Sequence, residues 1–243
     1  MGELNKDDLY REIFRRKSVR RFEQREPDQA LTDRINAAIA EIIPLNDSPA
    51  ALQVFPADQA GVSFGKAPCC LGVYAQNGYP SQLNAAFMLQ EMGLYLSRLG
   101  LGSCWLGMAK PKGPLAEYRG LAFSKLIVFG YPGEALYRDD PGQFNRKTLR
   151  EITDIQGRDE LLEAVRLAPS AMNRQGWYLT SEGNKIRLYM AGNHFIVRKL
   201  MDPLTTADAG IALCHLWLSA SRNACFVSAR REDAAGTIRN NYA

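Results

Sequence analysis

The sequence has few of the residues that metal sites and disulfide scaffolds require. Its 243 residues include two histidines, His194 and His215, and five cysteines, an odd number without a CxxC pair. These counts argue against a His-rich metal site and against a disulfide framework. A reducing cytoplasm is the simplest compartment for such a chain.

The sequence also lacks long hydrophobic runs and a strong excess of charge. Residues 2–17 are charged throughout and predict no secretory signal. The most apolar stretch, 84–110, contains Gln90, Glu91 and Arg98, which is typical of a buried helix rather than a membrane span. A net charge of +4 is too small to indicate a nucleic-acid partner. We therefore expect neither a membrane nor a nucleic acid as a partner.

The composition is that of an ordinary globular protein, with 46% hydrophobic and 23% charged residues, so one or two compact domains are expected. Apolar residues at steps of three and four predict helices, and short apolar runs closed by glycine or proline predict strands. The predicted helices are 7–17, 32–43, 84–99, 159–167 and 207–222, and the predicted strands are 67–75, 125–132, 176–181, 186–191 and 225–229. Gly100 is expected to end the third helix in a left-handed conformation.

The two parts of the chain repeat the same order of elements, on either side of a polar connector at 138–146. A shift of 124 residues places Asn84 on Asp208 and Leu94 on Leu218. The alternative is that two similar helix patterns align by chance. The preserved order of helix, strand and long helix favours an internal repeat.

The repeat predicts two related halves, 1–145 and 146–243, packed about an approximate two-fold axis in a single chain. We predict an α+β fold with a central, mainly antiparallel sheet from both halves, flanked by helices. The long helices 84–99 and 207–222 are expected to pack near the axis. The chain would be a monomeric pseudo-dimer, and the sequence leaves further self-association open.

The densest cluster of positive charge is RRKSVRR, residues 15–21, where Ser18 interrupts five cations. Arginine forks, a lysine and a hydroxyl are groups that bind a phosphate by charge-assisted hydrogen bonds. A solvated helix end and a basic arm for nucleic acid are the alternatives. A second basic group, Asn145-Arg146-Lys147, precedes a predicted short helix at 148–152, where free backbone N–H groups attract anions.

Two further segments could border a ligand. In APSAMNRQGW, residues 168–177, Ser170, Asn173 and Gln175 offer donors and acceptors that suit a planar heterocycle, although a purely structural loop would also use such residues. In GLGSCWLG, residues 100–107, the glycines allow close approach of the backbone to a ligand and an aromatic ring can border it. The cysteine of that segment has no evident base partner and is predicted to be a small apolar filler.

These segments resemble those of a known family. RRKSVRRF at 15–22 resembles the RRSxRxF motif of the FMN-dependent nitroreductases, and APSAMNRQGW resembles their flavin-contacting PSxxNxQPW loop. GLGSCWLG, GYPG at 130–133 and NRKTLREI at 145–152 are similar to further segments of the family. The repeat suggests the branch in which two nitroreductase-like halves are fused in one chain, with an α/β/α arrangement.

The resemblance implies that FMN and NAD(P)H are the cofactors and that the chemistry is mediated by the flavin, without a side-chain nucleophile or a metal. By the family pattern, Arg16, Lys17 and Ser18 would anchor the phosphate or ribityl chain, and Arg20 would lie near the pyrimidine end. The implied cofactor-binding residues are Arg16, Lys17, Ser18, Arg20, Cys104, Trp105, Leu106, Arg146, Lys147, Pro169, Ser170, Met172, Asn173 and Gln175.

The resemblance also implies one flavin site per chain. Residues 44–52, PLNDSPAAL, lack the PSxxNxQ order, and no second RRxSxR follows residue 150. Two departures from the family pattern stand out. Gly176 replaces the proline before Trp177, and the last residues, Asn240-Asn241-Tyr242-Ala243, form no basic tail, so Arg146 and Lys147 are expected to supply the late phosphate contact.

The implied function is an oxidoreductase that passes electrons from NAD(P)H to a nitroaromatic or quinone-type small-molecule oxidant by a ping-pong mechanism. A flavin-binding protein without activity and a basic-armed phosphate-binding module without flavin are the alternatives. The same fold could also carry reductive dehalogenation or flavin processing.

Overall fold

The structure is a computed structural model and describes residues 3–109, 111, 113–183, 185–191, 198–221, 229–232 and 237–240. Its helices are α1 (Lys6–Ile13), α2 (Gln29–Glu41), α3 (Tyr79–Arg98), α4 (Leu149–Ile152), α5 (Asp159–Arg166) and α6 (Arg198–Ser221). Its strands are β1 (Ala50–Pro56), β2 (Cys69–Ala75), β3 (Gly102–Leu106), β4 (Glu117–Tyr118), β5 (Leu121–Gly130), β6 (Trp177–Glu182), β7 (Lys185–Met190), β8 (Ala229–Glu232) and β9 (Thr237–Asn240).

Every predicted helix is present, with shifted ends. The third ends as expected, since Gly100 follows it with a φ of +79°. The first ends at Ile13 rather than near Lys17, because the next residues run as extended chain and bridge to other segments, with Arg16 opposite Tyr137 and Ser18 beside Ser103. The predicted last strand, 225–229, lies outside the described residues except at its final position, where β8 begins.

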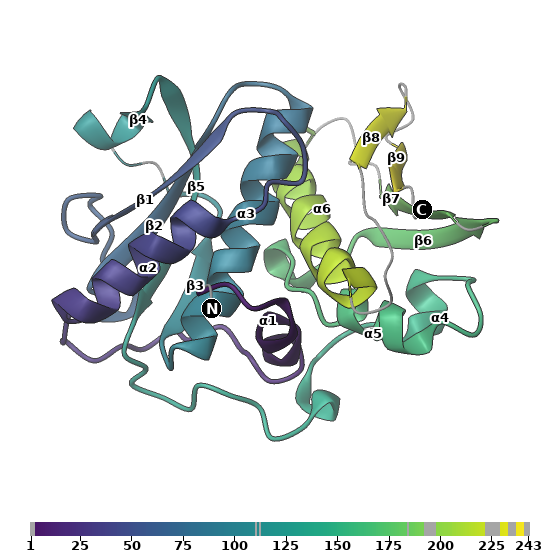
Figure 1. Cartoon of the computed structure of the whole chain (residues 1–243), viewed down its shortest axis with the longest axis horizontal. Coiled ribbons are helices and arrows are strands. Elements are labelled where there is room, and N and C mark those ends of the chain that lie inside the picture. The colour runs from purple at the N-terminus through teal and green to yellow at the C-terminus, as the bar shows by residue number, and fades with distance from the viewer. Residues whose placement is uncertain are drawn as a thin grey trace.

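The strands form two antiparallel sheets. The first has the order β1-β2-β5-β3, with β4 on β5, and the second has the order β6-β7-β9-β8. The prediction of an α+β fold with mainly antiparallel pairing is confirmed. The prediction of one central sheet from both halves is wrong, because α3 and α6 lie between the two sheets and keep them apart (Figure 1).

The packing of α3 against α6 forms the centre of the molecule, as predicted for the two long helices. Every residue of α3 from Leu83 to Ser97 is buried. Gly210 of α6 lies so close to α3 that an added Cβ would be 2.5 Å from the carbonyl oxygen of Leu83 and 2.9 Å from the amide nitrogen of Phe87. The contact therefore requires a residue without a side chain. No helix within the described ranges is both long and apolar enough to cross a bilayer.

Apart from β4, the two sheets have the same strand order: in each, the neighbours follow as the first, second, fourth and third strand in chain order. One hydrogen bond is also made in the same way beside each sheet. Asn84 of α3 accepts the backbone N–H of Leu45 through Oδ1 at 2.9 Å. Asp208 of α6 accepts the backbone N–H of Ala171 through Oδ1 at 2.8 Å. Each long helix thus holds the loop that leads into the first strand of one sheet.

Candidate functional site

A cavity of about 700 Å³ is lined by residues from both the early and the late part of the chain. That size lies within the range of small-molecule and cofactor sites. Its described lining residues are Ser18, Arg20, Cys104, Trp105, Gly107, Met108, Lys125, Arg138, Arg146, Pro169, Ser170, Ala171, Met172, Asn173, Leu204, Ala207, Asp208 and Ile211. The structure thus brings the early basic segment and the late polar loop to one cavity, as the sequence predicts. Four cations and one acid in this lining suit a ligand with negative charge.

Arg16 is a buried cation beside this cavity. Its side chain is 6% exposed, and Nη2 donates to the hydroxyl of Ser18 at 3.3 Å. No carboxylate in the described part of the chain lies within ion-pair distance of its guanidinium. Burial, followed by repulsion from Arg138 and Arg146, lowers the pKa of Arg16 to about 10, so it stays charged at neutral pH. A buried, uncompensated cation is costly, and an anionic ligand would remove that cost.

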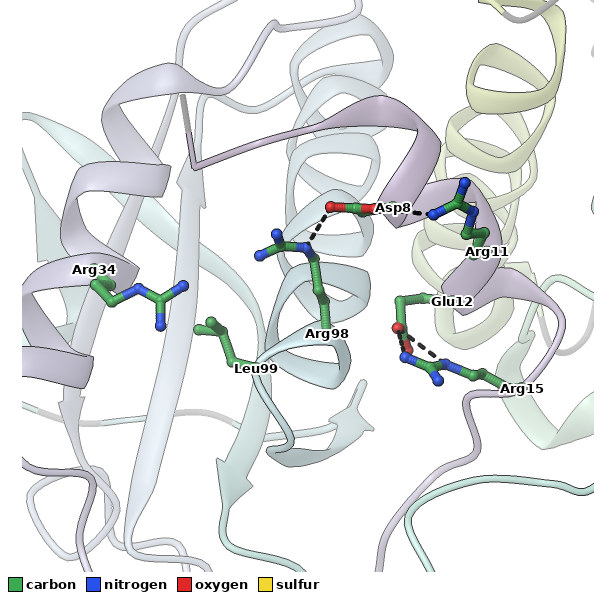
Figure 2. Close-up of a pocket in the computed structure, with 7 residues that line it drawn as sticks. All are labelled: Asp8, Arg11, Glu12, Arg15, Arg34, Arg98 and Leu99. Atoms are coloured by element: carbon green, nitrogen blue, oxygen red, sulfur yellow. Dashed lines mark hydrogen bonds and ion pairs between the residues drawn. The ribbon is translucent and has the colours of Figure 1, made fainter. Parts of the chain in front are cut away.

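The neighbouring Arg15 shows the contrast. It points into a separate surface pocket of about 620 Å³ between α1, α2 and α3, where its guanidinium is paired with Glu12 (Figure 2). In the same pocket, Asp8 bonds to Arg98 at 2.8 Å and lies 3.5 Å from Arg11. The charges of this surface pocket are thus compensated within the protein. Of the two adjacent arginines, Arg15 is therefore neutralised by Glu12. Arg16, without a carboxylate partner among the described residues, is available to bind an external anion.

Arg138 is a site residue that the sequence analysis missed. It begins the predicted connector, and its Nη1 donates to the carbonyl of Arg16 at 2.6 Å while its guanidinium stacks 4.0 Å from the ring centroid of Phe144. Burial lowers its pKa. The sequence signal for Arg138 was its position close to the predicted Asn145-Arg146-Lys147 group. Its contact with Arg16 could not be predicted from spacing, because the two residues are far apart in the sequence.

Arg146 links the connector to the polar loop. Its Nη1 donates to Oδ1 of Asn173 at 2.6 Å, and its Nε donates to the carbonyl of Ala168 at 3.1 Å. Burial lowers its pKa to about 10. The cation is therefore held at the cavity wall by the loop that forms the other side of the site.

The polar loop has a strained backbone. Met172, Asn173 and Gln175 have φ of +53°, +56° and +48°, a left-handed region in which residues other than glycine are uncommon. Met172 is 73% exposed although it is large and apolar. The hydroxyl of Ser170 accepts the N–H of Gln175 at 2.8 Å and closes the loop. Strain of this kind clusters at ligand-binding sites.

Five predicted site residues line no part of the cavity: Arg16, Lys17, Leu106, Lys147 and Gln175. Gln175 is buried and bonds to Lys147, whose N–H it accepts at 2.7 Å and whose Nζ reaches its carbonyl at 3.1 Å. Lys17 lies on the same basic segment near Glu134, and Leu106, in β3 of the first sheet, is partly buried against apolar residues. Arg16 lies next to the cavity and donates to the hydroxyl of Ser18, which lines it. Lys147 and Gln175 clamp the loop to the connector, and their direct contact with a ligand stays a prediction.

Strand β3 supplies the wall formed by Cys104 and Trp105. Burial raises the pKa of the Cys104 thiol, which fits the predicted role of a small filler. Of the closely spaced glycines, Gly107 lines the cavity, and its approach to a ligand stays a prediction. Gly102 packs against Val19, since an added Cβ there would be 2.7 Å from that side chain. Gly102 instead lets the basic segment pack on β3.

A buried polar chain fixes the indole of Trp105. Its Nε1 donates to Oε1 of Gln90 at 3.1 Å, and Nε2 of Gln90 lies 2.9 Å from Nε2 of His215. Nδ1 of His215 donates to the carbonyl of Ala164 at 2.8 Å, so Nε2 must accept from Gln90. Burial lowers the pKa of His215 to about 3, which keeps this tautomer neutral. This histidine thus orients the cavity wall and forms no catalytic triad.

Asp208 is the second site residue that the sequence analysis did not select. It is 2% exposed and lines the cavity; its Oδ1 holds the loop, while Oδ2 makes no hydrogen bond and lies 3.9 Å from Nη2 of Arg174. Burial raises the pKa of Asp208 to about 7. The hydrogen bond from the N–H of Ala171 and the charge of Arg174 lower this pKa, but by less than burial raises it. The repeat alignment that placed Asp208 on Asn84 was the available signal.

The raised pKa of Asp208 predicts a pH-dependent stability. An aspartate in the unfolded chain ionises near 3.9, so folding stability contributed by the protonated carboxyl is present below about pH 4 and lost as pH rises to about 7. In Asp208→Asn the loss is absent, and Oδ1 of the asparagine can still hold Ala171, as Asn84 holds Leu45. The difference in free energy of unfolding, variant minus wild type, should therefore increase by up to roughly 4 kcal/mol from pH 4 to pH 8.

Urea unfolding of both proteins without added ligand across this range measures the effect. Glu91, whose pKa burial raises to about 8, acts in the same direction in both proteins and cancels in the difference. A difference that does not change with pH would mean that Asp208 ionises normally.

The chain matches the sequence family described as "Putative TM nitroreductase" over residues 8–220. No curated protein matches it significantly. A putative nitroreductase from Thermotoga maritima MSB8 has a similar structure, with a TM-score of 0.68, 19% identity, and coverage of 96% of this chain and 92% of that chain. The likeness extends over nearly the whole fold.

Two solved structures described as containing FMN cover less of the chain. A nitroreductase from Desulfitobacterium hafniense DCB-2 has 18% identity and a TM-score of 0.44, and covers 58% of this chain and 98% of that chain. A putative nitroreductase from Desulfovibrio desulfuricans has 24% identity and a TM-score of 0.44, and covers 60% of this chain and 93% of that chain.

Proposed function

The chain belongs to the putative TM nitroreductase family, and from this premise we propose that it is an FMN-dependent oxidoreductase that passes electrons from NAD(P)H to nitroaromatic or quinone-type acceptors. The observation that carries the proposal is the buried cation of Arg16, which has no carboxylate partner among the described residues and lies beside a cavity of cofactor size. A phosphate ester is the anion that such a site fits.

The phosphate would be held by Arg16 and Ser18 from the early segment and by Arg138 and Arg146 from the connector. Burial lowers the pKa of all three arginines, and repulsion from Arg138 adds to this effect at Arg16 and Arg146, which supports a common anionic partner. Guanidinium groups bind phosphate oxygens by paired, charge-assisted hydrogen bonds. Arg20, exposed at the same cavity, would lie near the pyrimidine end of the ring and stabilise negative charge there.

The flavin ring would lie between the loop of the second half and β3 of the first. Pro169, Ser170, Met172 and Asn173 line one wall, and Cys104 and Trp105 line another. When bound, FMN supplies the hydride and electron chemistry, and the protein supplies position, charge and access. NAD(P)H and the oxidant would occupy the same position beside the ring in turn, which is the basis for expecting ping-pong kinetics.

We also propose that 1–145 and 146–243 are two nitroreductase-like halves that share one flavin site. The equal strand order of the two sheets and the matching bonds of Asn84 and Asp208 support this division. One site per chain follows because the basic segment comes from the first half and the polar loop comes from the second.

The decisive experiment is a spectrum of the purified protein with extraction of the cofactor. We expect a yellow protein with one FMN per chain that oxidises NAD(P)H when a quinone is added. A colourless protein that does not take up FMN would contradict the proposal. A yellow protein that does not oxidise NAD(P)H would contradict the enzymatic part and leave a flavin-binding protein.

Asn173→Ala is predicted to weaken FMN binding by about 10-fold, the effect of one lost hydrogen bond to a charged or polar partner. The substitution also removes the acceptor that holds Arg146 at the cavity wall. Fluorescence titration of the flavin-free protein measures the change. Asn46→Ala is the matched control, since Asn46 lies in the corresponding loop of the first half and its amide donates to the carbonyl of Pro80. An equal loss in both variants would show that the loop has no particular role.

A further inference from the structure

A smaller cavity of about 380 Å³ adjoins the cofactor cavity. The two share four lining residues, Gly107, Met108, Lys125 and Leu204. We call the smaller one the side cavity. Its other described walls are mainly apolar and are formed by Ala109, Pro111, Ala116, Phe123, Ser124 and Pro203. A planar aromatic group therefore fits its chemistry.

Lys125 stands at the boundary of the two cavities. It lies on β5 and is 8% exposed, and Nζ donates to the carbonyl of Ser124 at 3.2 Å. In the part of the chain that the structure covers, no acid pairs with it. The ammonium has three donors, so two are left for a ligand. Burial lowers the pKa of Lys125, as expected for a cation without a counter-charge.

The cofactor does not account for this charge. The arginines that would hold the phosphate, Arg138 and Arg146, line the cofactor cavity and take no part in the side cavity. Lys125 lines both. A phosphate bound by these arginines would therefore leave Lys125 without a counter-charge, next to the apolar walls of the side cavity.

We propose that the side cavity binds the non-reacting part of the electron acceptor, and that Lys125 selects acceptors with an anionic oxygen group, such as an aromatic carboxylate. This inference rests on the proposed function and names the substrate class of the same site. The apolar walls would take up the aromatic ring, and the two remaining N–H donors of Lys125 would bind the carboxylate oxygens. A neutral analogue of the same shape would leave the buried ammonium unpaired, which makes the site discriminate by charge.

The test compares 4-nitrobenzoate with 4-nitrobenzamide as acceptors for the FMN-loaded enzyme. The two share the ring and the nitro group and differ in charge. Lys125→Met, which keeps the length of the side chain, should raise KM for 4-nitrobenzoate at least about 10-fold and change KM for 4-nitrobenzamide less than about two-fold, as expected for a lost charged hydrogen bond. Lys125→Arg keeps the charge and should retain the preference for the carboxylate.

Two further measurements separate the possible outcomes. FMN content should be the same in Lys125→Met and wild type, and a proportional loss of FMN would overturn the proposal by making Lys125 a cofactor ligand. Calorimetric titration with benzoate, which carries no nitro group, should show binding to wild type and at least about 10-fold weaker binding to Lys125→Met. This readout needs no turnover, so it tests the side cavity even if NAD(P)H oxidation fails. Equal losses for both nitro compounds, or equal benzoate binding, would overturn the proposal.

Discussion

Arg16→Met is expected to lower the affinity for FMN by about 100-fold or more and, at the same time, to leave the flavin-free protein at least as stable as the wild type. The first effect follows from the loss of two charge-assisted hydrogen bonds to phosphate, each worth about 1.5–3 kcal/mol. The second follows because the substitution removes a buried cation that has no carboxylate partner within the described residues. Fluorescence titration with FMN and urea unfolding of the flavin-free protein measure the two effects.

Arg15→Met is the matched control for this pair of effects. Arg15 is paired with Glu12, whose side chain is buried and whose other oxygen accepts the hydroxyl of Ser97 at 2.7 Å. Removing Arg15 leaves a buried carboxylate with one partner fewer, so the control should lose stability and keep its affinity for FMN. If Arg16→Met destabilised the flavin-free protein and bound FMN normally, Arg16 would be a structural residue and the phosphate site would lie elsewhere.

Gly210→Val is expected to lower the free energy of unfolding by about 3 kcal/mol or more, within the range of overpacked core substitutions. An added Cβ would meet the backbone of α3 at 2.5 Å, and backbone atoms inside a helix cannot move aside without separating the two helices. In an exposed helix the removal of a glycine would instead stabilise by up to about 1 kcal/mol. The sign of the effect therefore reports on the α3–α6 contact.

Gly93→Ala in α3 is the corresponding control. An added Cβ at Gly93 has its nearest neighbours at 3.9 Å, which is ordinary contact. This variant should be neutral or more stable by up to about 1 kcal/mol, because alanine has the higher helix propensity. Urea unfolding followed by circular dichroism distinguishes the two. Equal behaviour of both variants would contradict the close packing at Gly210.

The elements of the fold were predictable because their signals are local. The long helix α3 could be located from its apolar run and from Gly100, and β6 and β7 could be located from two short apolar runs. The division into two sheets could not be predicted, because it depends on how closely α6 approaches α3 through Gly210. Spacing along a chain does not encode the distance between two helices.

The site residues that belong to short motifs could be predicted from the sequence, whereas isolated site residues were missed. Ser18, Arg146 and Asn173 were identified from short motifs, and all three line the cavity. Lys125 was read as the start of an apolar strand and Asp208 as part of an apolar helix. In such segments one charged residue is recognised as functional only when its burial and missing partners are known.

The two loops held by Asn84 and Asp208 belong to a single polypeptide. In an assembly of identical subunits, any amino-acid change is copied into every equivalent position, so both loops would have to change together. Here each can be altered without its counterpart. The loop at 44–48 can therefore diverge under selection for folding alone, while the loop at 170–175 would also be constrained by the proposed flavin site.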